Sequence, residues 1–477
     1  MGRLPLAVVF IFLGWMSSVA TASPVSGDWY LAQDHAAAAQ SELPASLTQV
    51  RVAVLDSGVD GGHPAIAASI AAARSFVGDD PLTDSNGHGT FVAGEIVALA
   101  TAAAANTTRP SPVQLLIAKI TDDTGSISLS AEARAIYWAV ENGARVINLS
   151  LGGLRDPNHP ASDTYSPVEA AAVRYAIGHR VVVVAAVGNG DEAPSEPWTY
   201  ASWPAALPHV IGVSAIAPDG SVPDWSNRDP RFNELAAPGS EIVSAFPRSL
   251  TALTPTCFDQ GYSDCGPSDY QPAEGTSFAA PQVSAAAALL LSAEPQLTPD
   301  QVAWLLERTT DDANPRTGCS ACALGRDPLT GWGTLDVGKA VAALSGPIPQ
   351  ASMYEPTNDA GYQARLLTAP QATLTADLDY WENPLDVYRV HLDRGEQLWV
   401  RLTAQSGGVT LALWRPGTAH VPVAAPALLR ERLIAATGTL PTKRLHYHAI
   451  RTGWYYLEIA LQAKTNAAYT LAFATVH

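Results

Sequence analysis

The hydrophobic pattern of the chain changes its period once, near residue 345. Before that point, short uninterrupted runs of Val, Ile and Leu alternate with longer Ala-rich stretches. Such short runs are typical of strands buried on both faces, and the longer stretches are typical of helices. The runs that predict strands are 50–56, 114–120, 145–151, 180–187 and 209–217. The stretches that predict helices are 89–105, 130–143, 167–178 and 282–292. This alternation predicts an α/β fold, a parallel sheet with helices on both faces.

Beyond residue 345 the apolar positions recur every second residue. Tyr388, Val390 and Leu392 alternate in this way, and the pattern returns over 398–402 and again between 455 and 473. Several short amphipathic strands of this kind predict a β-sandwich. The stretch before them is rich in Pro, Gly and Asn, which is typical of a linker. We therefore predict three successive parts: an α/β domain over 23–345, a linker over 346–364 and a C-terminal β-sandwich domain over 365–477.

Residues 1–22 have the pattern of an export signal. Arg3 precedes the apolar run 4–16, and the sequence ATA at 20–22 matches a cleavage site before Ser23. The apolar run is short for a membrane-spanning helix. We expect cleavage and a secreted or periplasmic protein with no membrane contact afterwards. Retention of the segment as an N-terminal anchor is the alternative.

The whole chain is acidic. Its 477 residues include 28 Lys or Arg and 45 Asp or Glu, which gives a net charge of −17. This charge argues against nucleic acid and anionic membranes as partners. The chain is also 47% hydrophobic, enough for a large core and a second domain. We expect a soluble monomer.

The four cysteines lie within one 66-residue window. In an exported chain an even number of cysteines predicts disulfides, and four residues allow three connectivities. We favour the local pairs Cys257–Cys265 and Cys319–Cys322. The second pair is also a CxxC motif that binds metal or carries redox chemistry in other proteins, but one such motif without a second ligand pair is a weak signal.

Ser277 lies in the sequence GTSFAAP, residues 275–281, directly before an Ala- and Leu-rich helix. The start of a helix favours negative charge, which suits a nucleophile whose attack creates an oxyanion. It equally suits an ordinary helix cap. Asp56 at the end of a Val-rich strand and His88 at the start of a helix favour catalysis. An imidazole can deprotonate a serine hydroxyl, and a carboxylate orients the imidazole. We therefore hypothesise a catalytic triad of Asp56, His88 and Ser277. We interpret His63 as a structural residue.

These motifs resemble those of subtilisin-like serine proteases. The order Asp, His, Ser along the chain is that of subtilisin, and the sequences DSG, NGHGTFVAG and GTSFAAP carry the likeness. The sequence AAVGNG at 185–190 resembles the family's oxyanion-hole motif. This implies that Asn189 and the Ser277 N–H bind the oxyanion. The likeness spans roughly residues 27–345. It implies a subtilisin-like fold and a serine endopeptidase that hydrolyses polypeptide substrates through an acyl-enzyme.

The resemblance also implies a substrate-binding set. VINLSLGG at 146–153 resembles the strand that pairs with an extended substrate. The implied residues are Ser150, Leu151, Gly152, Gly153, Ala186, Val187, Gly188 and Ser202. Their small side chains favour a large apolar residue at P1, whereas Asp191 and Glu192 would favour a basic one.

Two departures from the family concern regulation. Residues 23–49 are too few for the inhibitory propeptide domain that many relatives carry. The segment 101–114 lacks the Asn- and Gly-rich loop that binds calcium in many relatives. We expect no cofactor in the chemistry and assign no metal ligands; a structural calcium ion stays open.

The C-terminal segment resembles a bacterial pre-peptidase C-terminal domain, through 385–404 and 453–462. That likeness implies a bacterial accessory domain for secretion, folding or targeting. The function we expect is therefore a secreted serine endopeptidase. The alternatives are a dedicated maturation protease with one partner substrate and a catalytically silent binding protein.

Overall fold

The computed structural model describes most of the chain. The described residues are 9–10, 29–105, 111–121, 125–159, 161–251, 268–348, 364–368, 370–378, 385–405, 408–418, 432–437, 440–461 and 466–476. The chain divides into two compact units, the first formed by 1–156 and 161–349 and the second by 350–477 together with the short segment 157–160. The predicted export signal, except for 9–10, and most of the predicted linker lie outside the described residues. The domain boundaries proposed above stay a prediction.

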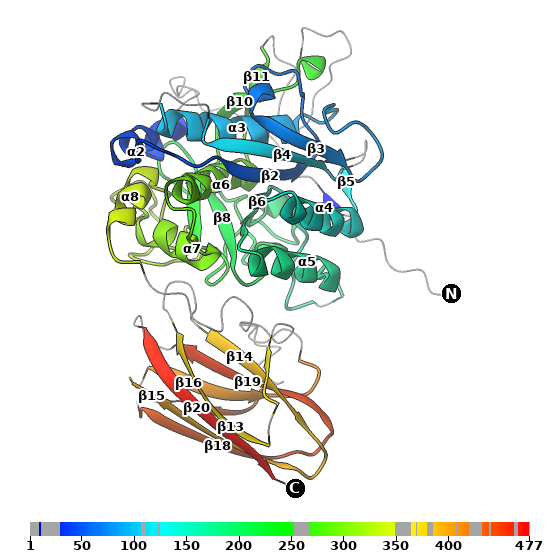
Figure 1. Ribbon diagram of the computed structural model, residues 1–477, viewed down its shortest axis with the longest axis vertical. Helices are drawn as coiled ribbons and strands as arrows, with labels where there is room; N and C mark the ends of the chain where they lie inside the picture. Colours follow the sequence, from blue (N-terminus) through cyan, green and yellow to red (C-terminus); the bar gives the residue numbers. More distant parts are fainter. Residues whose placement is uncertain are drawn as a thin grey trace. The chain divides into compact units, whose positions relative to one another are not determined.

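The first unit is built on a seven-stranded parallel sheet, drawn at the centre of the upper part of Figure 1. The strand order is β3-β4-β2-β6-β7-β8-β9, and every neighbouring pair in it is parallel. The strands are β2 (Val50–Asp56), β3 (Ile70–Ser75), β4 (Val113–Lys119), β6 (Ala144–Leu149), β7 (Val182–Ala186), β8 (Val210–Ile216) and β9 (Leu235–Pro238). The predicted parallel sheet is confirmed.

Helices cover both faces of this sheet (Figure 1). Helices α3 (His88–Ala103) and α6 (Thr276–Ala293) pack against each other, and α4 (Leu129–Glu141) packs against α5 (Pro167–Gly178). Among the described helices, only α6 has the length and apolar composition of a membrane span, but 94% of that window is buried in the unit. Its apolarity is therefore explained by its place in the core, against β6, β7 and β8.

The remaining elements of this unit are short. The helices are α1 (Trp29–Gln33), α2 (Ala36–Glu42), α7 (Pro299–Arg308) and α8 (Val337–Ala342). The 3₁₀ turns are η1 (Ala67–Ser69), η2 (Gly190–Glu192), η3 (Arg248–Leu250) and η4 (Ala343–Ser345). The small antiparallel pairs are β1 (Val9–Phe10) with β5 (Ser126–Ile127), and β10 (Ile242–Ala245) with β11 (Tyr270–Ala273).

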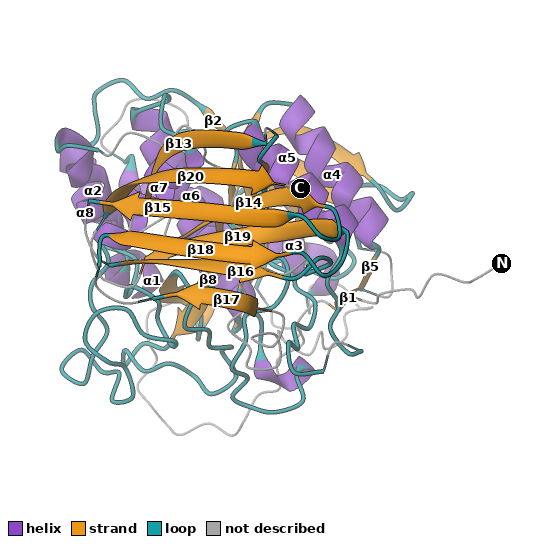
Figure 2. Cartoon of the chain, turned by 90° about the horizontal axis from the view of Figure 1, so that it is seen from below, coloured by secondary structure: helices purple, strands orange, loops and turns teal. Residues whose placement is uncertain are grey.

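The second unit consists of two sheets with a shared apolar core, as the period of two predicted. One sheet has the order β12-β14-β19-β16-β17 and the other β13-β20-β15-β18; the latter faces the viewer in Figure 2. The strands are β12 (Arg365–Leu366), β13 (Gln371–Leu378), β14 (Leu385–Leu392), β15 (Gln397–Ala404), β16 (Val409–Trp414), β17 (Arg432–Ala436), β18 (Thr442–His448), β19 (Gly453–Leu461) and β20 (Ala467–Val476). Leu402, Leu457 and Leu471 are among the core residues that both sheets contribute. The unit is a β-sandwich in which every strand pair except β12–β14 is antiparallel.

Candidate active site

Asp56 and His88 form a direct hydrogen-bonded pair. Asp56 is the last residue of β2 and His88 is the first residue of α3. The Nδ1 atom of His88 lies 2.9 Å from both Oδ1 and Oδ2 of Asp56. The pair is buried, with 3% of Asp56 and none of His88 exposed. A carboxylate in this position fixes the orientation of the imidazole and stabilises its protonated form.

The glycines on either side of His88 are required by the backbone around it. Gly89 lies so close to the preceding loop that a Cβ there would be 2.1 Å from the carbonyl oxygen of Gly58. Gly87 has a φ of 95°, and a Cβ there would lie 2.4 Å from the ring of Phe246. Larger residues at either position would therefore displace His88 from Asp56.

A buried polar cluster holds the loop between β2 and α3. The hydroxyl of Ser57 donates to Oδ1 of Asp84 at 2.9 Å and accepts from the Gly89 N–H at 2.9 Å. The other carboxylate oxygen of Asp84 accepts from both the N–H and the hydroxyl of Thr90. Burial raises the pKa of Asp84, and these hydrogen bonds oppose that rise. The cluster ties the segment after Asp56 to the first turn of the helix that carries His88.

Ser277 lies in the first turn of α6, against the end of β6. Its hydroxyl donates to the carbonyl oxygen of Ser150 at 3.2 Å, and the Ser150 hydroxyl donates to the carbonyl oxygen of Ser277 at 2.6 Å. The next residue, Phe278, packs its ring 5.3 Å from the ring of His88, measured between centroids. The structure thus brings the start of α6 to the side of the Asp56–His88 pair.

Asn189 follows β7 and lies beside the start of α6. Its Oδ1 accepts from the N–H of Thr276 at 3.1 Å and from the Thr276 hydroxyl at 2.9 Å. The same hydroxyl accepts from the Gly188 N–H at 3.2 Å. Because the amide oxygen is engaged by Thr276, the Nδ2 group is the one left to donate. At the helix start, the first backbone N–H groups have no partner within the helix. The arrangement supplies hydrogen-bond donors beside Ser277.

A small cavity lies next to Asn189. It has a volume of about 10 Å³, room for about one water molecule, and its lining residues are Gly152, Gly153, Leu154, Asn189, Ala193, Ser202 and Asn227. Gly153 is hydrogen-bonded to Trp203 in both directions, which fixes that wall. A Cβ at Gly188 would lie 2.3 Å from the Ser202 hydroxyl, so a larger residue there would displace Ser202, which lines the cavity.

Only some of the predicted substrate-binding residues line this cavity. Gly152, Gly153 and Ser202 line the cavity, and Ser150 contacts Ser277 instead. Leu151, Ala186 and Val187 are buried and are not among its lining residues. Asn227, Ala193 and Leu154 line the cavity without having been predicted.

Thr276 was also missed by sequence reasoning, although it lies directly before Ser277. Its contacts with Asn189 join two motifs that are 87 residues apart in the sequence. His63, in contrast, lies buried with Nε2 3.1 Å from the carbonyl oxygen of Asp269, as expected for a structural histidine.

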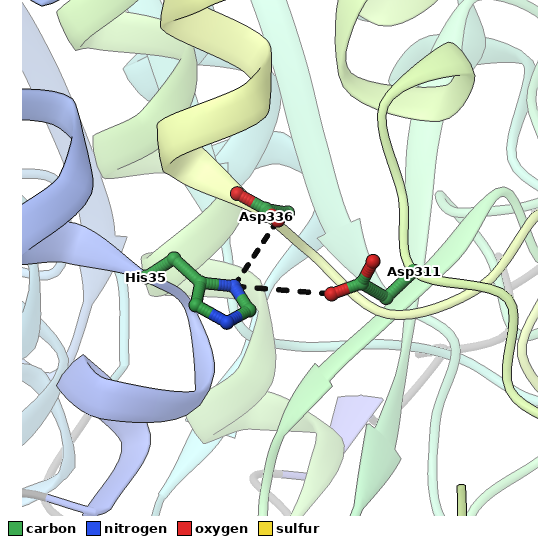
Figure 3. Close-up of side chains that lie close together, drawn as sticks. All are labelled: His35, Asp311 and Asp336. Carbon is green, nitrogen blue, oxygen red and sulfur yellow. Dashed lines mark ion pairs between the residues drawn. The ribbon is translucent and has the colours of Figure 1, made fainter. Parts of the chain in front are cut away.

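A separate cluster of His35, Asp311 and Asp336 has the spacing of metal ligands (Figure 3). The Nδ1 atom of His35 lies 3.1 Å from Asp336 and 3.8 Å from Asp311. However, the Lys339 ammonium group already contacts both carboxylates. Calcium prefers six to eight oxygen ligands. These residues do not fit a calcium ion, and we assign no metal ligands.

Cys319 and Cys322 are joined by a disulfide, as predicted. Their side chains are buried and pack with Ala313, in the segment of the chain that precedes α8. Cys257 and Cys265 lie outside the described residues. Their pairing stays a prediction.

Comparison with known proteins gives one consistent result. Residues 48–333 match the model of the subtilase family. The chain is 34% identical to subtilisin E of Bacillus subtilis (strain 168) over 264 residues, which is 55% of this chain and 60% of that protein. It is 33% identical to subtilisin DY of Bacillus licheniformis over 261 residues, 54% of this chain and 83% of that protein.

One solved structure shows the same fold. The crystal structure of a lanthipeptide protease aligns with a TM-score of 0.53 at 24% identity, and covers 66% of this chain and 94% of that one. Apart from 157–160, the residues 48–333 that match the family belong to the first unit.

Proposed function

The chain belongs to the subtilase family, a family of serine-type endopeptidases, and on this premise we propose that Asp56, His88 and Ser277 carry out its peptide-bond hydrolysis. The observation that supports this most is the buried Asp56–His88 pair, with Nδ1 2.9 Å from both carboxylate oxygens, beside the helix start that bears Ser277. The substrates are polypeptides.

In the proposed mechanism, His88 removes the hydroxyl proton of Ser277 as the oxygen attacks the peptide carbonyl carbon. Asp56 stabilises the imidazolium that forms. The Nδ2 group of Asn189 and the N–H of Ser277 bind the oxyanion of the tetrahedral intermediate. His88 then protonates the leaving amine. Water, deprotonated by His88, hydrolyses the acyl-enzyme and releases the second product.

We further propose that the enzyme prefers an uncharged residue at P1. The cavity beside Asn189 is too small to hold a side chain as it stands, but the residues that line it include no charged side chain, so a charged P1 residue placed against them would lack a counter-ion. Two of its polar lining residues are joined to each other, since Nδ2 of Asn227 donates to the Ser202 hydroxyl at 3.4 Å. This supports the apolar preference over the basic one.

The β-sandwich is proposed to be an accessory unit of a secreted bacterial enzyme, on the resemblance of its sequence to pre-peptidase C-terminal domains. The dedicated maturation protease remains the second candidate, since it requires the same catalytic residues and differs only in substrate range. Cleavage of a denatured proteome by the purified enzyme separates the two. Many cleaved proteins support a general endopeptidase, whereas a single cleaved partner supports a maturation protease.

Labelling with a fluorophosphonate probe tests the nucleophile. We expect the wild-type chain to be labelled and Ser277→Ala to lose both labelling and turnover, the latter by about 10⁶-fold, the loss known for a subtilisin nucleophile. Ser292→Ala is a matched control, because Ser292 lies at the other end of α6 and its hydroxyl donates to the carbonyl oxygen of Thr48. Unlabelled wild-type protein would favour the silent binding protein, and labelling of Ser277→Ala would place the nucleophile elsewhere.

A further inference from the structure

The outward face of the sheet β13-β20-β15-β18 carries a groove along β20. Alternate residues of β20 point outward, and two of them, Ala472 and Ala474, are small. The strands on either side place longer side chains next to these alanines. Ala474 pairs with Gln371 on β13 and with Trp399 on β15, and Ala472 pairs in the same way with Thr373 and Arg401. Figure 2 shows the four strands side by side. The groove has a volume of about 730 Å³.

Trp399 presents a flat apolar surface in this groove. Half of Trp399 is exposed, which is unusual for so large an apolar residue. His446, its partner on β18, stacks on the indole at 3.6 Å between centroids and 16° between planes. The Nε2 atom of His446 lies 3.1 Å from Oε1 of Gln397, which holds the imidazole in place. Because His446 covers one face of the indole, the other face is turned toward Ala474 and the groove.

Two arginines lie next to this aromatic pair. Arg401 and Arg444 are directly opposite each other on β15 and β18, and both are exposed. Like charges at opposed positions of neighbouring strands are unfavourable. No acidic partner of either guanidinium is found in the part of the chain that the structure describes. Among the described residues, the pair is therefore a local site of positive charge without a counter-ion.

The charge of the surrounding sequence also differs from that of the whole chain. Residues 364–477 contain 11 Lys or Arg and 8 Asp or Glu, a net charge of +3, whereas the chain as a whole carries −17. At physiological salt, charges more than about 8 Å apart are largely screened. The charge that acts on an anion at the arginine pair is therefore set mainly by its near surroundings, in a segment whose own net charge is positive.

We propose that this groove binds an acidic polysaccharide that carries carboxylate groups. A sugar ring packs its C–H face against the exposed face of Trp399. A neighbouring carboxylate accepts hydrogen bonds from Arg401 and Arg444, whose planar guanidinium groups match it in shape. Gln371 and Thr373, on the other side of the groove, hydrogen-bond the sugar hydroxyls.

An extended acidic peptide fits the groove less well. The backbone of β20 is paired on both sides, with β13 and with β15, over the length of the groove. A peptide lying there would find no free main-chain groups to pair with, as binding by strand addition requires. A polysaccharide needs only side-chain donors and acceptors, an apolar face and a positive charge. These are the groups that line the groove.

Affinity electrophoresis of the full chain in native gels that contain polygalacturonate tests the proposal at about 0.15 M salt. We expect the wild-type chain to be retarded, and Trp399→Ala and the double variant Arg401→Gln/Arg444→Gln each to weaken binding at least about tenfold. Trp399→Tyr should keep most of the affinity, since it retains an aromatic face. The matched control is Trp454→Ala, which removes a tryptophan that is 40% exposed on β19, near His391 and Arg389.

Several results would overturn the proposal. One is a wild-type chain that polygalacturonate does not retard; another is an equal loss of binding in Trp454→Ala. Equally strong, Trp399-dependent binding to poly-L-glutamate would make the ligand an acidic peptide. Self-association in analytical ultracentrifugation that Trp399→Ala abolishes would make the groove a contact between copies of the chain. Unchanged peptidase activity and melting temperature verify that each variant is folded.

Discussion

At the scale of single residues, the hydroxyl of Thr276 determines which way the amide of Asn189 faces. It donates to Oδ1 of Asn189 at 2.9 Å and accepts from the N–H of Gly188. If the Nδ2 group of Asn189 binds the oxyanion, Asn189→Ala removes one donor that acts mainly in the transition state. We expect kcat to fall by about 10²–10³-fold with little change in KM. Steady-state kinetics on a chromogenic peptide measures both. A raised KM with normal kcat would instead make Asn189 a substrate-binding residue.

The contact between Thr276 and Asn189 can be tested by itself. Thr276→Val keeps the shape of the side chain but removes its hydroxyl, so Oδ1 of Asn189 loses one of its two hydrogen bonds. We expect kcat to fall about tenfold while KM and the melting temperature change little. Thr276→Ser restores the hydroxyl and should restore kcat. A merely structural threonine would instead lower the melting temperature without a specific effect on kcat.

The residues of the candidate site differ in how far the sequence could predict them. Asp56, His88, Asn189 and Ser277 stand in short motifs of distinctive composition, and Nδ1 of His88 lies 2.9 Å from Oδ1 of Asp56. Thr276 and Asn227 could not be predicted in the same way, because each acts through contacts with residues that are distant in the sequence. The sequences around these two residues are typical of an ordinary turn or loop.

At the scale of elements, the pairing of α4 with α5 buries two carboxyl groups. Glu132 and Glu169 are almost fully buried on these helices. Burial raises the pKa of Glu132 to about 7. Burial also raises the pKa of Glu169 well above the usual range of a glutamate, and repulsion from Glu132 adds to that rise. An exposed glutamate titrates near 4.3. The folded state therefore holds these protons more tightly than the unfolded state. This tighter binding of protons stabilises the folded state. The stabilisation is fully present below about pH 4.3 and is lost as the pH rises through about 7.

Replacing Glu132 by Gln should remove the part of this pH dependence that Glu132 contributes and the repulsion that it exerts on Glu169. The neutral amide keeps the size of the side chain and cannot ionise. We expect Glu132→Gln to stabilise the first unit by about 1–3 kcal/mol at pH 8 and to change it little at pH 5. Scanning calorimetry at the two pH values, in the Ser277→Ala background to prevent self-digestion, measures the difference. Glu294→Gln, an exposed glutamate at the end of α6, is the control. Equal effects of Glu132→Gln at both pH values would contradict a raised pKa of Glu132.

The two strands of the seven-stranded sheet that the sequence failed to predict share a position in it. The five inner strands are long runs of Val, Ile and Leu, and each was predicted within a few residues. The strands that were missed, β3 and β9, are the two edges of the seven-stranded sheet. β3 is Ala-rich and only partly buried, and β9 has four residues and ends in a proline. Because β3 is only partly buried, it needs fewer large apolar residues than the inner strands; β9 is buried, but with four residues it is too short to show the pattern by which strands are recognised.

At the scale of the whole molecule, acidic charge is concentrated in the first part of the chain. Residues 1–363 contain 17 Lys or Arg and 37 Asp or Glu, a net charge of −20, against +3 for the remainder. The first part contains every proposed catalytic residue, and the second contains the proposed polysaccharide groove. The division of charge matches the division of proposed roles, since a carboxylated polymer would be repelled by the first part and attracted to the second.

The two units should also be separable in stability and activity. The first unit has its own sheet and helices, and its last described helical turn is η4, Ala343–Ser345. The second has a separate apolar core contributed by both of its sheets. Units with separate cores commonly unfold in separate transitions. We therefore expect two calorimetric transitions for the Ser277→Ala chain, and a single one when the chain ends after Pro349.

The same truncation, with Ser277 retained, should cleave a short peptide with a kcat/KM within about threefold of the full chain, well under the 1.4 kcal/mol of a tenfold effect. A truncated chain that is insoluble or inactive would mean that the β-sandwich is needed to complete the protease.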